Sequence, residues 1–318
     1  MTVMTPPPAA AAAAPVSAEG KPRPKAPSRF REVTSAVFSG WAARISGAAL
    51  LLLACCALFA DFLAPFDPRE QDLLRINLAP AWLGGPQEHL LGTDALGRDI
   101  ASRLLYGLRL SLVIGLSAAT IAACLGLLLG VLAGYYEKVL GTVLLRLADV
   151  QLALPFAAVG IALSAVVGSG AVMLIVFLGY WGWTTFSRVI VSTVAQVRRV
   201  DYVTAARTYG ASAPRIMFRH VLPSVISPVV VLWTNMAGIL TLAESGLSLL
   251  GLGVQPPEFT LGSMLADGQT DLRLAPWAAI APGAVLMVIL LTFNTFGDSL
   301  RDALTPGSPK SKHDPELS

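Results

Sequence analysis

The stretch DYVTAARTYGASAPRIMFRHVLP, residues 201–223, is polar and basic, yet it lies between two long apolar runs. Its first half predicts a helix with Asp201 as the N-cap, ending at Gly210, because glycine adopts the left-handed conformation without steric cost. Ser212 is placed to cap a second short helix that has Pro214 in its first turn. The segment therefore predicts a helix–turn–helix elbow that leads directly into the next apolar run.

Two interpretations of this elbow remain open from its residues alone. Helical spacing puts three residues on one face of the first helix: Tyr202, Ala206 and Tyr209. Three arginines are expected to be exposed: Arg207, Arg215 and Arg219. Basic loops are common on the cytoplasmic side of membrane proteins, so these arginines either only set the topology or belong to a docking surface.

The composition indicates an integral membrane protein. Of the 318 residues, 54% are hydrophobic and 14% are charged, against roughly 25% charged in ordinary globular proteins. Apolar runs of about 20 residues match a helix that crosses the bilayer core. We predict an all-α polytopic protein with six transmembrane helices, at about 45–62, 110–134, 143–167, 171–194, 224–243 and 276–296. The short turn before residue 171 predicts a tight antiparallel pair of the third and fourth spans.

The Lys and Arg residues set the predicted orientation. Of 23 such residues, 17 fall in the N-terminal tail, in alternate loops and at the C-terminus. By the positive-inside rule this side is cytoplasmic, together with both termini and the elbow. The predicted segments are a disordered tail (1–43), a first transmembrane helix (44–66), an external segment (67–107), a five-helix domain (108–302) with the elbow at 198–222, and a second tail (303–318).

Charged residues within the predicted spans are costly to bury and require partners. Asp149 follows Arg146 by three residues, so the two are expected to pair on one helix. Glu244 lies toward the outer end of the fifth span. It either lines a pathway through the helices, where it would meet an amino group, or bonds to a neighbouring helix.

The segment GTDALGRD, residues 92–99, lacks the Lys-Ser/Thr ending of a phosphate-binding loop and lies on the predicted outer side. We interpret it as structural. Thr93 or Asp94 is expected to cap a short helix at the membrane surface, and Arg98 is expected to pair with Asp99.

The elbow contains the pattern AAxxxG…HxLP, which resembles the cytoplasmic loop of ABC importer permeases. The resemblance implies a type I ABC importer permease fold, in which this coupling helix docks on an ATP-hydrolysing subunit. It implies ATPase-coupling roles for Asp201, Thr204, Ala205, Ala206, Arg207, Gly210, His220 and Pro223. The family usually has Glu at the position of Thr204, so no contact by that carboxylate is carried over.

Three further blocks resemble permeases for dipeptides, oligopeptides and nickel, of the second permease type that carries GTDxxGRD. They are HLLGTDALGRDIASRLLYGLRLSL (89–112), LSLLGLGVQPP (247–257) and FNTFGDSLRDALTP (293–306). The resemblance implies a multi-pass subunit of a bacterial inner-membrane importer for di- or oligopeptides, with import of nickel complexes or another small solute as alternatives. The implied partners are a homologous second permease, two ABC ATPase subunits and an external solute-binding protein, besides membrane lipid.

The sequence indicates no enzymatic activity and no cofactor. It contains no GxxxxGK[ST] motif, so ATP is expected to bind to partner subunits. The three histidines are far apart, which predicts neither a catalytic triad nor a metal site, and nothing indicates binding to nucleic acid. An ion-coupled secondary transporter is the alternative from another class; it predicts more charges along the spans and needs no folded elbow.

Overall fold

The computed structural model describes residues 40–304, except for the side chains of Glu137, Lys138 and Arg207. The first half of this range contains α2 (Trp41–Leu58), α3 (Ala60–Leu63), η1 (Ala81–Leu83), α4 (Ile100–Tyr135), η2 (Glu137–Gly141), α5 (Thr142–Ala153) and α6 (Phe156–Val167). The second half contains α7 (Ala171–Val197), α8 (Asp201–Thr208), α9 (Ala213–Ile216), η3 (Met217–Val221), α10 (Leu222–Leu249), α11 (Leu261–Thr270) and α12 (Trp277–Leu304). The predicted all-α class is confirmed.

Several helices extend beyond the boundaries predicted from the sequence. The predicted tails lie outside the described residues, apart from 40–43 and 303–304, and α2 already begins at Trp41. Helix α4 has 36 residues and begins at Ile100, ten residues before the predicted second span. The last part of the predicted external segment, 67–107, therefore belongs to this helix.

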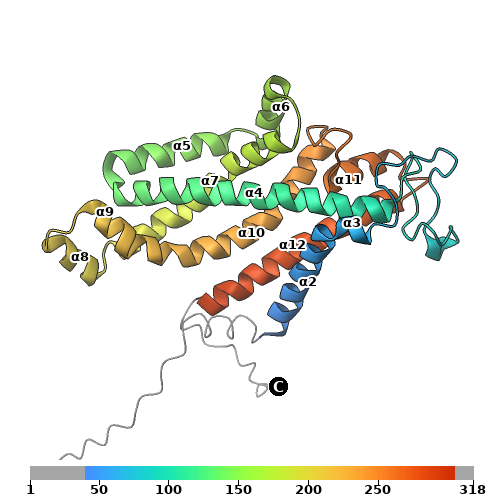
Figure 1. Cartoon of the computed structure of the whole chain (residues 1–318). Helices are drawn as coiled ribbons and strands as arrows, with labels where there is room; N and C mark the ends of the chain where they lie inside the picture. The colour runs from blue at the N-terminus through green and yellow to red at the C-terminus, as the bar shows by residue number, and fades with distance from the viewer. Residues whose placement is uncertain (1–39, 305–318) are drawn as a thin grey trace, which may run out of the picture.

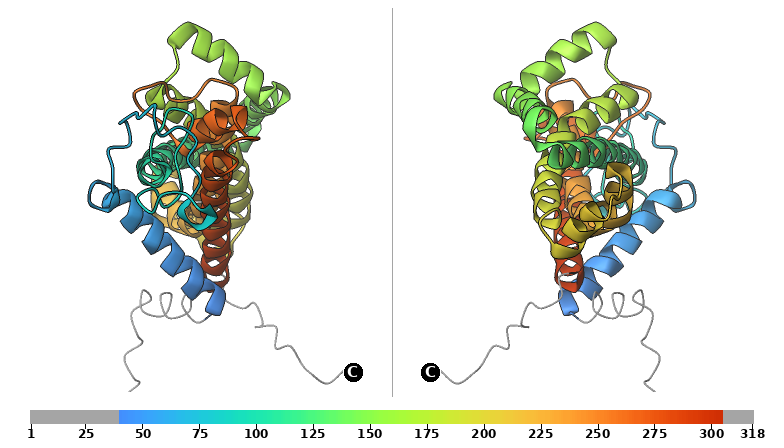
Figure 2. Two further views of the ribbon diagram at one scale, coloured as in Figure 1. Left: turned by 90° about the vertical axis from the view of Figure 1, so that its right-hand side faces the viewer. Right: turned by 90° about the vertical axis from the view of Figure 1, so that its left-hand side faces the viewer.

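The helices form an elongated bundle with different structures at its two ends (Figure 1). Helices α4, α7 and α10 run along the bundle. An irregular cap, residues 64–99, covers the end where α4 begins, and α8 and α9 lie at the opposite end (Figure 1). Seen along the bundle, α2 and the pair α5–α6 lie on opposite edges of the central helices (Figure 2).

Five helical segments are long and apolar enough to cross a membrane, and the third predicted span is broken. Its two halves, Val139–Ala153 and Phe156–Val167, meet at an angle of 88°. Pro155 explains the break, because its ring clashes with a preceding helical turn and it has no N–H to donate. Leu154 is accordingly extended, with φ −82° and ψ 137°. The prediction of one continuous helix over 143–167 is thus wrong, and six spans result only if the bent pair counts as one.

The closest packing in the bundle joins α4 to α7. Gly126, Gly130 and Gly134 recur every four residues along α4, and a Cβ added to each would lie 2.3, 2.9 and 2.7 Å from the Cβ atoms of Phe186, Ile190 and Val194. Small residues at this spacing let two membrane helices approach closely. Helix α7 therefore packs mainly against α4, and the predicted tight pairing of the third and fourth spans is wrong.

We expect Gly126→Leu to separate α4 from α7, because the new side chain would occupy the space of the Phe186 Cβ atom. The expected loss is about 1–3 kcal/mol of unfolding free energy, as for other overpacked interiors. It can be measured by thermal unfolding of the purified protein in detergent. Gly246→Leu is the matched control, since Gly246 is helical and exposed, and a Cβ added there would have nothing within 4 Å. Equal unfolding temperatures for the two variants would contradict the α4–α7 assignment.

Candidate functional site

The first helix of the elbow begins one residue earlier than the sequence predicts. The backbone N–H groups of Val203 and Thr204 donate to the carbonyl oxygen of Val200, at 3.0 and 3.1 Å. Asp201 is therefore the first residue of α8 and not its N-cap. Its exposed carboxylate still lies in the first turn, where the positive end of the helix favours a negative charge.

The predicted turn at Gly210 is confirmed. Gly210 has φ +80°, in the left-handed region that side chains with a Cβ rarely adopt. The N–H of Ala211 donates to the carbonyl of Ala206 at 3.0 Å, a bond typical of a helix that ends on a left-handed glycine. Ser212 precedes α9 as predicted and Pro214 lies in its first turn, but the Ser212 hydroxyl makes no capping bond.

The elbow is anchored to the bundle by aliphatic side chains and presents aromatic ones at its surface. Val203 and Ile216 are buried in the main hydrophobic core, whereas Tyr209 is 91% exposed and Phe218 is 70% exposed. The predicted face of Tyr202, Ala206 and Tyr209 is thus not the buried face of α8. Aromatic side chains are enriched at protein interfaces relative to the rest of the surface.

The residues predicted to couple this chain to an ATPase lie together in the elbow or at its exit. Four of them are exposed along α8 and its end: Asp201, Thr204, Ala205 and Gly210. Ala206 and His220 are half-buried, and Pro223 is exposed at the start of α10. The rings of Tyr202 and His220 lie 5.7 Å apart, which connects α8 to η3. The side chain of Arg207 is outside the described part of the structure.

Glu244 is completely buried and bonded to its neighbours, which is the second of the two predicted alternatives. Its carboxyl accepts hydrogen bonds from the hydroxyls of Thr260 at 2.7 Å and Ser248 at 2.8 Å. The hydroxyls of Ser111 and Ser245 approach it at 3.4 Å. Since Ser111 belongs to α4 and Thr260 precedes α11, this one carboxyl connects three helices near the end of α10 that lies beside the cap.

The GTDALGRD segment is structural, but its contacts differ from the predicted ones. Asp99, not Thr93 or Asp94, caps a helix, and that helix is the long α4; its carboxylate accepts from the N–H of Ser102 at 2.7 Å. Asp99 also contacts His89 Nδ1 at 3.0 Å and does not pair with Arg98. Local sequence order therefore gave the wrong partners in this segment.

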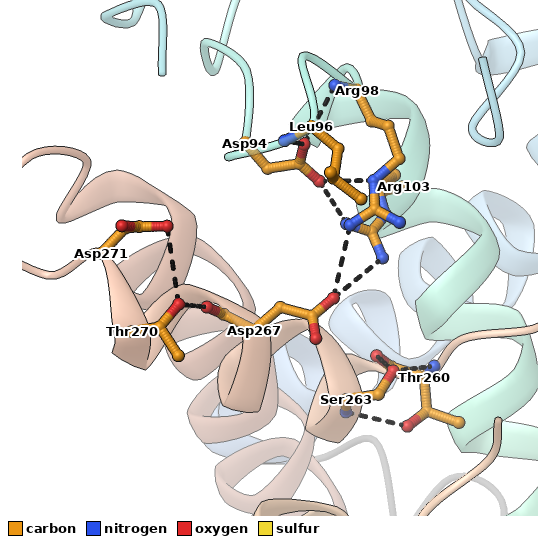
Figure 3. A network of polar contacts seen from close by, with 9 residues as sticks. All are labelled: Asp94, Leu96, Arg98, Arg103, Thr260, Ser263, Asp267, Thr270 and Asp271. Carbon is orange, nitrogen blue, oxygen red and sulfur yellow. Dashed lines mark hydrogen bonds and ion pairs between the residues drawn. The ribbon is translucent and has the colours of Figure 1, made fainter. Parts of the chain in front are cut away.

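Two buried or partly buried arginines connect this segment to α11 (Figure 3). The Asp94 carboxylate accepts from Arg98 Nε at 2.8 Å and from Arg103 Nη1. Asp267 of α11 lies further away, 3.4 Å from Arg98 Nη2 and 3.5 Å from Arg103 Nη2. The guanidinium of Arg103 also stacks over the ring of Phe259, at 4.7 Å. These contacts hold the cap, α4 and α11 together.

Asp149 likewise has a tertiary partner instead of the predicted local one. Its carboxylate pairs with Arg188 of α7 at 2.8 Å, not with Arg146. The sequence reasoning also missed Asp267 and Thr260. Thr260 precedes α11 and forms a capping box with Ser263, but the usual sequence signature of such a box has Glu or Gln in place of this serine. Within residues 40–304, no three His, Cys, Asp or Glu side chains are grouped to hold a metal ion.

We expect the Glu244 carboxyl to stabilise the cap end of the bundle. Glu244→Ala leaves the buried hydroxyls of Ser248 and Thr260 without their acceptor, so we expect a loss of about 2–4 kcal/mol of unfolding free energy. Glu244→Gln keeps an acceptor of the same shape and should lose less than half as much. Thermal unfolding followed by tryptophan fluorescence measures both. A Gln variant as unstable as the Ala variant would contradict this role.

Comparison with known proteins identifies the family. Residues 126–308 match the family described as binding-protein-dependent transport system inner membrane component, and residues 28–80 match the N-terminal TM domain of oligopeptide transport permease C. A di/tripeptide transport system permease protein of Pseudomonas aeruginosa is 41% identical, over 81% of this chain and 85% of its own length. A glutathione transport system permease protein of Pectobacterium atrosepticum is 37% identical (82% and 85%), and a dipeptide transport system permease protein of Haemophilus influenzae is 35% identical (81% and 88%). The chain thus belongs to the family of inner membrane components of binding-protein-dependent transport systems.

Proposed function

We propose that this chain is the permease subunit of an ATP-driven importer that moves di- and oligopeptides across the bacterial inner membrane. Family membership supports the transport role, and two of the relatives are named as di/tripeptide and dipeptide permeases. The observation that carries the proposal is the elbow. It is a folded surface with exposed Tyr209 and Phe218, at the end of the bundle opposite the cap.

The elbow is the docking surface for an ABC ATPase subunit. ATP is bound and hydrolysed by that partner, and this chain needs no cofactor of its own. Docking there requires the elbow to be cytoplasmic, in agreement with the predicted positive-inside orientation and with both termini on that side. An exposed aromatic side chain that fills a pocket on a partner is a frequent source of binding energy.

Helix α10 transmits the motion of the elbow to the outer end of the bundle. It follows η3 without a break and has 28 residues, a length of about 42 Å. Glu244, one turn before the end of α10, is bonded through Thr260 to the start of α11. Closure of the ATPases would thus move the elbow, α10 and the outer segment together, and so switch the pathway between its two openings.

Two further partners complete the importer. A homologous second permease encloses the pathway together with this chain, and an external solute-binding protein delivers the substrate to the cap side. The helices at the edges of the bundle have large exposed apolar side chains, such as Phe62 at 87% and Val166 at 85%. Such surfaces suit lipid or the helices of a second permease.

Gly210→Val should weaken the binding of the ATPase. A β-branched residue is strained at φ +80°, so α8 and α9 would no longer meet at the present angle. We expect co-purification of the ATPase to fall while insertion into the membrane stays normal. Gly210→Asn should retain binding, because Asn tolerates the left-handed conformation. Gly251→Val is the matched control: Gly251 has φ +79° and open space around it, but it follows α10 on the cap side. Loss of ATPase binding in the Gly251 variant alone would place the docking surface elsewhere.

Uptake of a labelled dipeptide should depend entirely on the partner ATPase. The complete system, reconstituted in liposomes with its binding protein, is expected to import the dipeptide only with ATP present. Changing the nucleotide-binding lysine of the ATPase should reduce uptake to the level measured without ATP. Uptake that persists and follows an ion gradient would instead support a secondary transporter, and uptake of nickel complexes but not peptides would assign the alternative substrate.

A further inference from the structure

The outer end of the bundle contains a hollow large enough for a small ligand. A cavity of about 570 Å³ lies between the cap, the start of α4, the loop after α10, and α11. A smaller hollow of about 230 Å³ adjoins it and shares four lining residues: Pro68, Arg69, Glu258 and Phe259. Small-molecule sites commonly have volumes of about 300–1,000 Å³, so the larger cavity is of suitable size.

The charged residues that line this cavity fall into two groups. Arg98, Arg103 and Asp267 also line the cavity, and ion pairs among them and with Asp94 make them part of its wall. Arg69 and Glu258 are exposed and line both hollows. Among the contacts of residues 40–304, neither of these two side chains has a hydrogen bond or an ion pair, although they have opposite charges. The cavity therefore offers one cation and one anion, both available to a ligand.

A ligand that satisfies both groups must itself have two opposite charges. A short peptide with free ends has an ammonium at one end and a carboxylate at the other. Guanidinium groups bind carboxylates well, and carboxylates accept hydrogen bonds from an ammonium. Phe259, which lines both hollows beside Pro68, supplies apolar surface for a side chain of the peptide. The headgroup of phosphatidylethanolamine shares this zwitterionic chemistry.

We propose that this cavity is a transit site for short zwitterionic peptides, in which Arg69 binds the terminal carboxylate and Glu258 binds the terminal ammonium. The proposal rests on the proposed peptide-import function and adds to it a recognition site on the permease itself. One wall of the cavity is α11, whose start is bonded to Glu244 at the end of α10. A movement of α10 would thus reshape the site and release its ligand toward the pathway.

The test uses alanyl-phenylalanine and its N-acetyl and C-amide derivatives. Binding of each labelled peptide to the purified permease–ATPase complex, without the binding protein, is measured by equilibrium dialysis in phosphatidylglycerol nanodiscs. We expect the free dipeptide to bind more tightly than either derivative. Arg69→Gln should weaken binding of the free and N-acetyl peptides by roughly three- to five-fold, the scale of a partly exposed ion pair, and leave the amide unaffected. Glu258→Gln should weaken the free and amide peptides and leave the N-acetyl peptide unaffected.

Two matched variants control for general loss of external charge. Arg273→Gln removes an exposed cation, and Glu70→Gln an exposed anion, neither of which lines these two hollows. Both should bind the three peptides as the unmodified complex does. Equal binding of all three peptides, equal losses for all three in the Arg69 or Glu258 variants, or no measurable binding to the unmodified complex would each overturn the proposal.

Further measurements identify a different occupant. If added phosphatidylethanolamine displaces the dipeptide, the site takes a lipid headgroup and the proposal is wrong. If the Arg69 and Glu258 variants lose affinity for the solute-binding protein itself, irrespective of its cargo, the cavity is a protein-docking surface. Uptake by the complete system distinguishes failure of the cavity proposal from failure of the proposed function. If peptides are imported but the Arg69 and Glu258 variants import all three peptides as the unmodified protein does, only the cavity assignment is wrong. If no peptide is imported at all, the proposed function is wrong.

Discussion

A carboxyl group inside a membrane protein has no bulk water to solvate it, and Glu244 obtains its hydrogen bonds from hydroxyl groups instead. These hydroxyls come from α4, from α10 and from the residue that caps α11. The requirement that this buried group be hydrogen-bonded therefore constrains how three helices meet at the cap end of the bundle. The cavity beside these helices depends on the same contacts, because Ser248 donates to Glu244 and is also one of the residues that line the cavity.

The two ends of the bundle are held by different physical interactions. At the elbow, buried aliphatic side chains such as Val203 and Ile216 fix a short helical segment whose outward surface is aromatic. At the cap, ion pairs and hydrogen bonds of Asp94, Arg103 and Asp267 connect irregular backbone to helices. Apolar packing tolerates small sliding movements, whereas directional polar contacts exchange partners.

Some features encoded by neighbouring residues were predicted correctly from the sequence, whereas the partners contributed by distant residues were not. The turn at Gly210 and the position of Ser212 are local, and both were predicted. The break at Pro155 was also local but was hidden by the apolar run around it. Asp149, in contrast, has Arg146 within reach on its own helix and pairs with Arg188 of α7. The spacing of charges along one helix does not indicate which residue of a neighbouring helix will face a given side chain.

Thr204 stands where the family usually has Glu, so the elbow lacks a carboxylate at this position. A threonine has no negative charge, and the Thr204 hydroxyl donates to the carbonyl of Val200 at 3.4 Å, back along its own helix. The exposed carboxylate of Asp201 lies three residues earlier, and residues three apart are neighbours on a helix surface. Compared with a glutamate at position 204, the negative charge of Asp201 therefore lies about one turn, roughly 5 Å, closer to the start of α8. An ATPase that pairs with a carboxylate at the Thr204 position would have to bind this elbow through its shape and through Tyr209 and Phe218, without that ion pair.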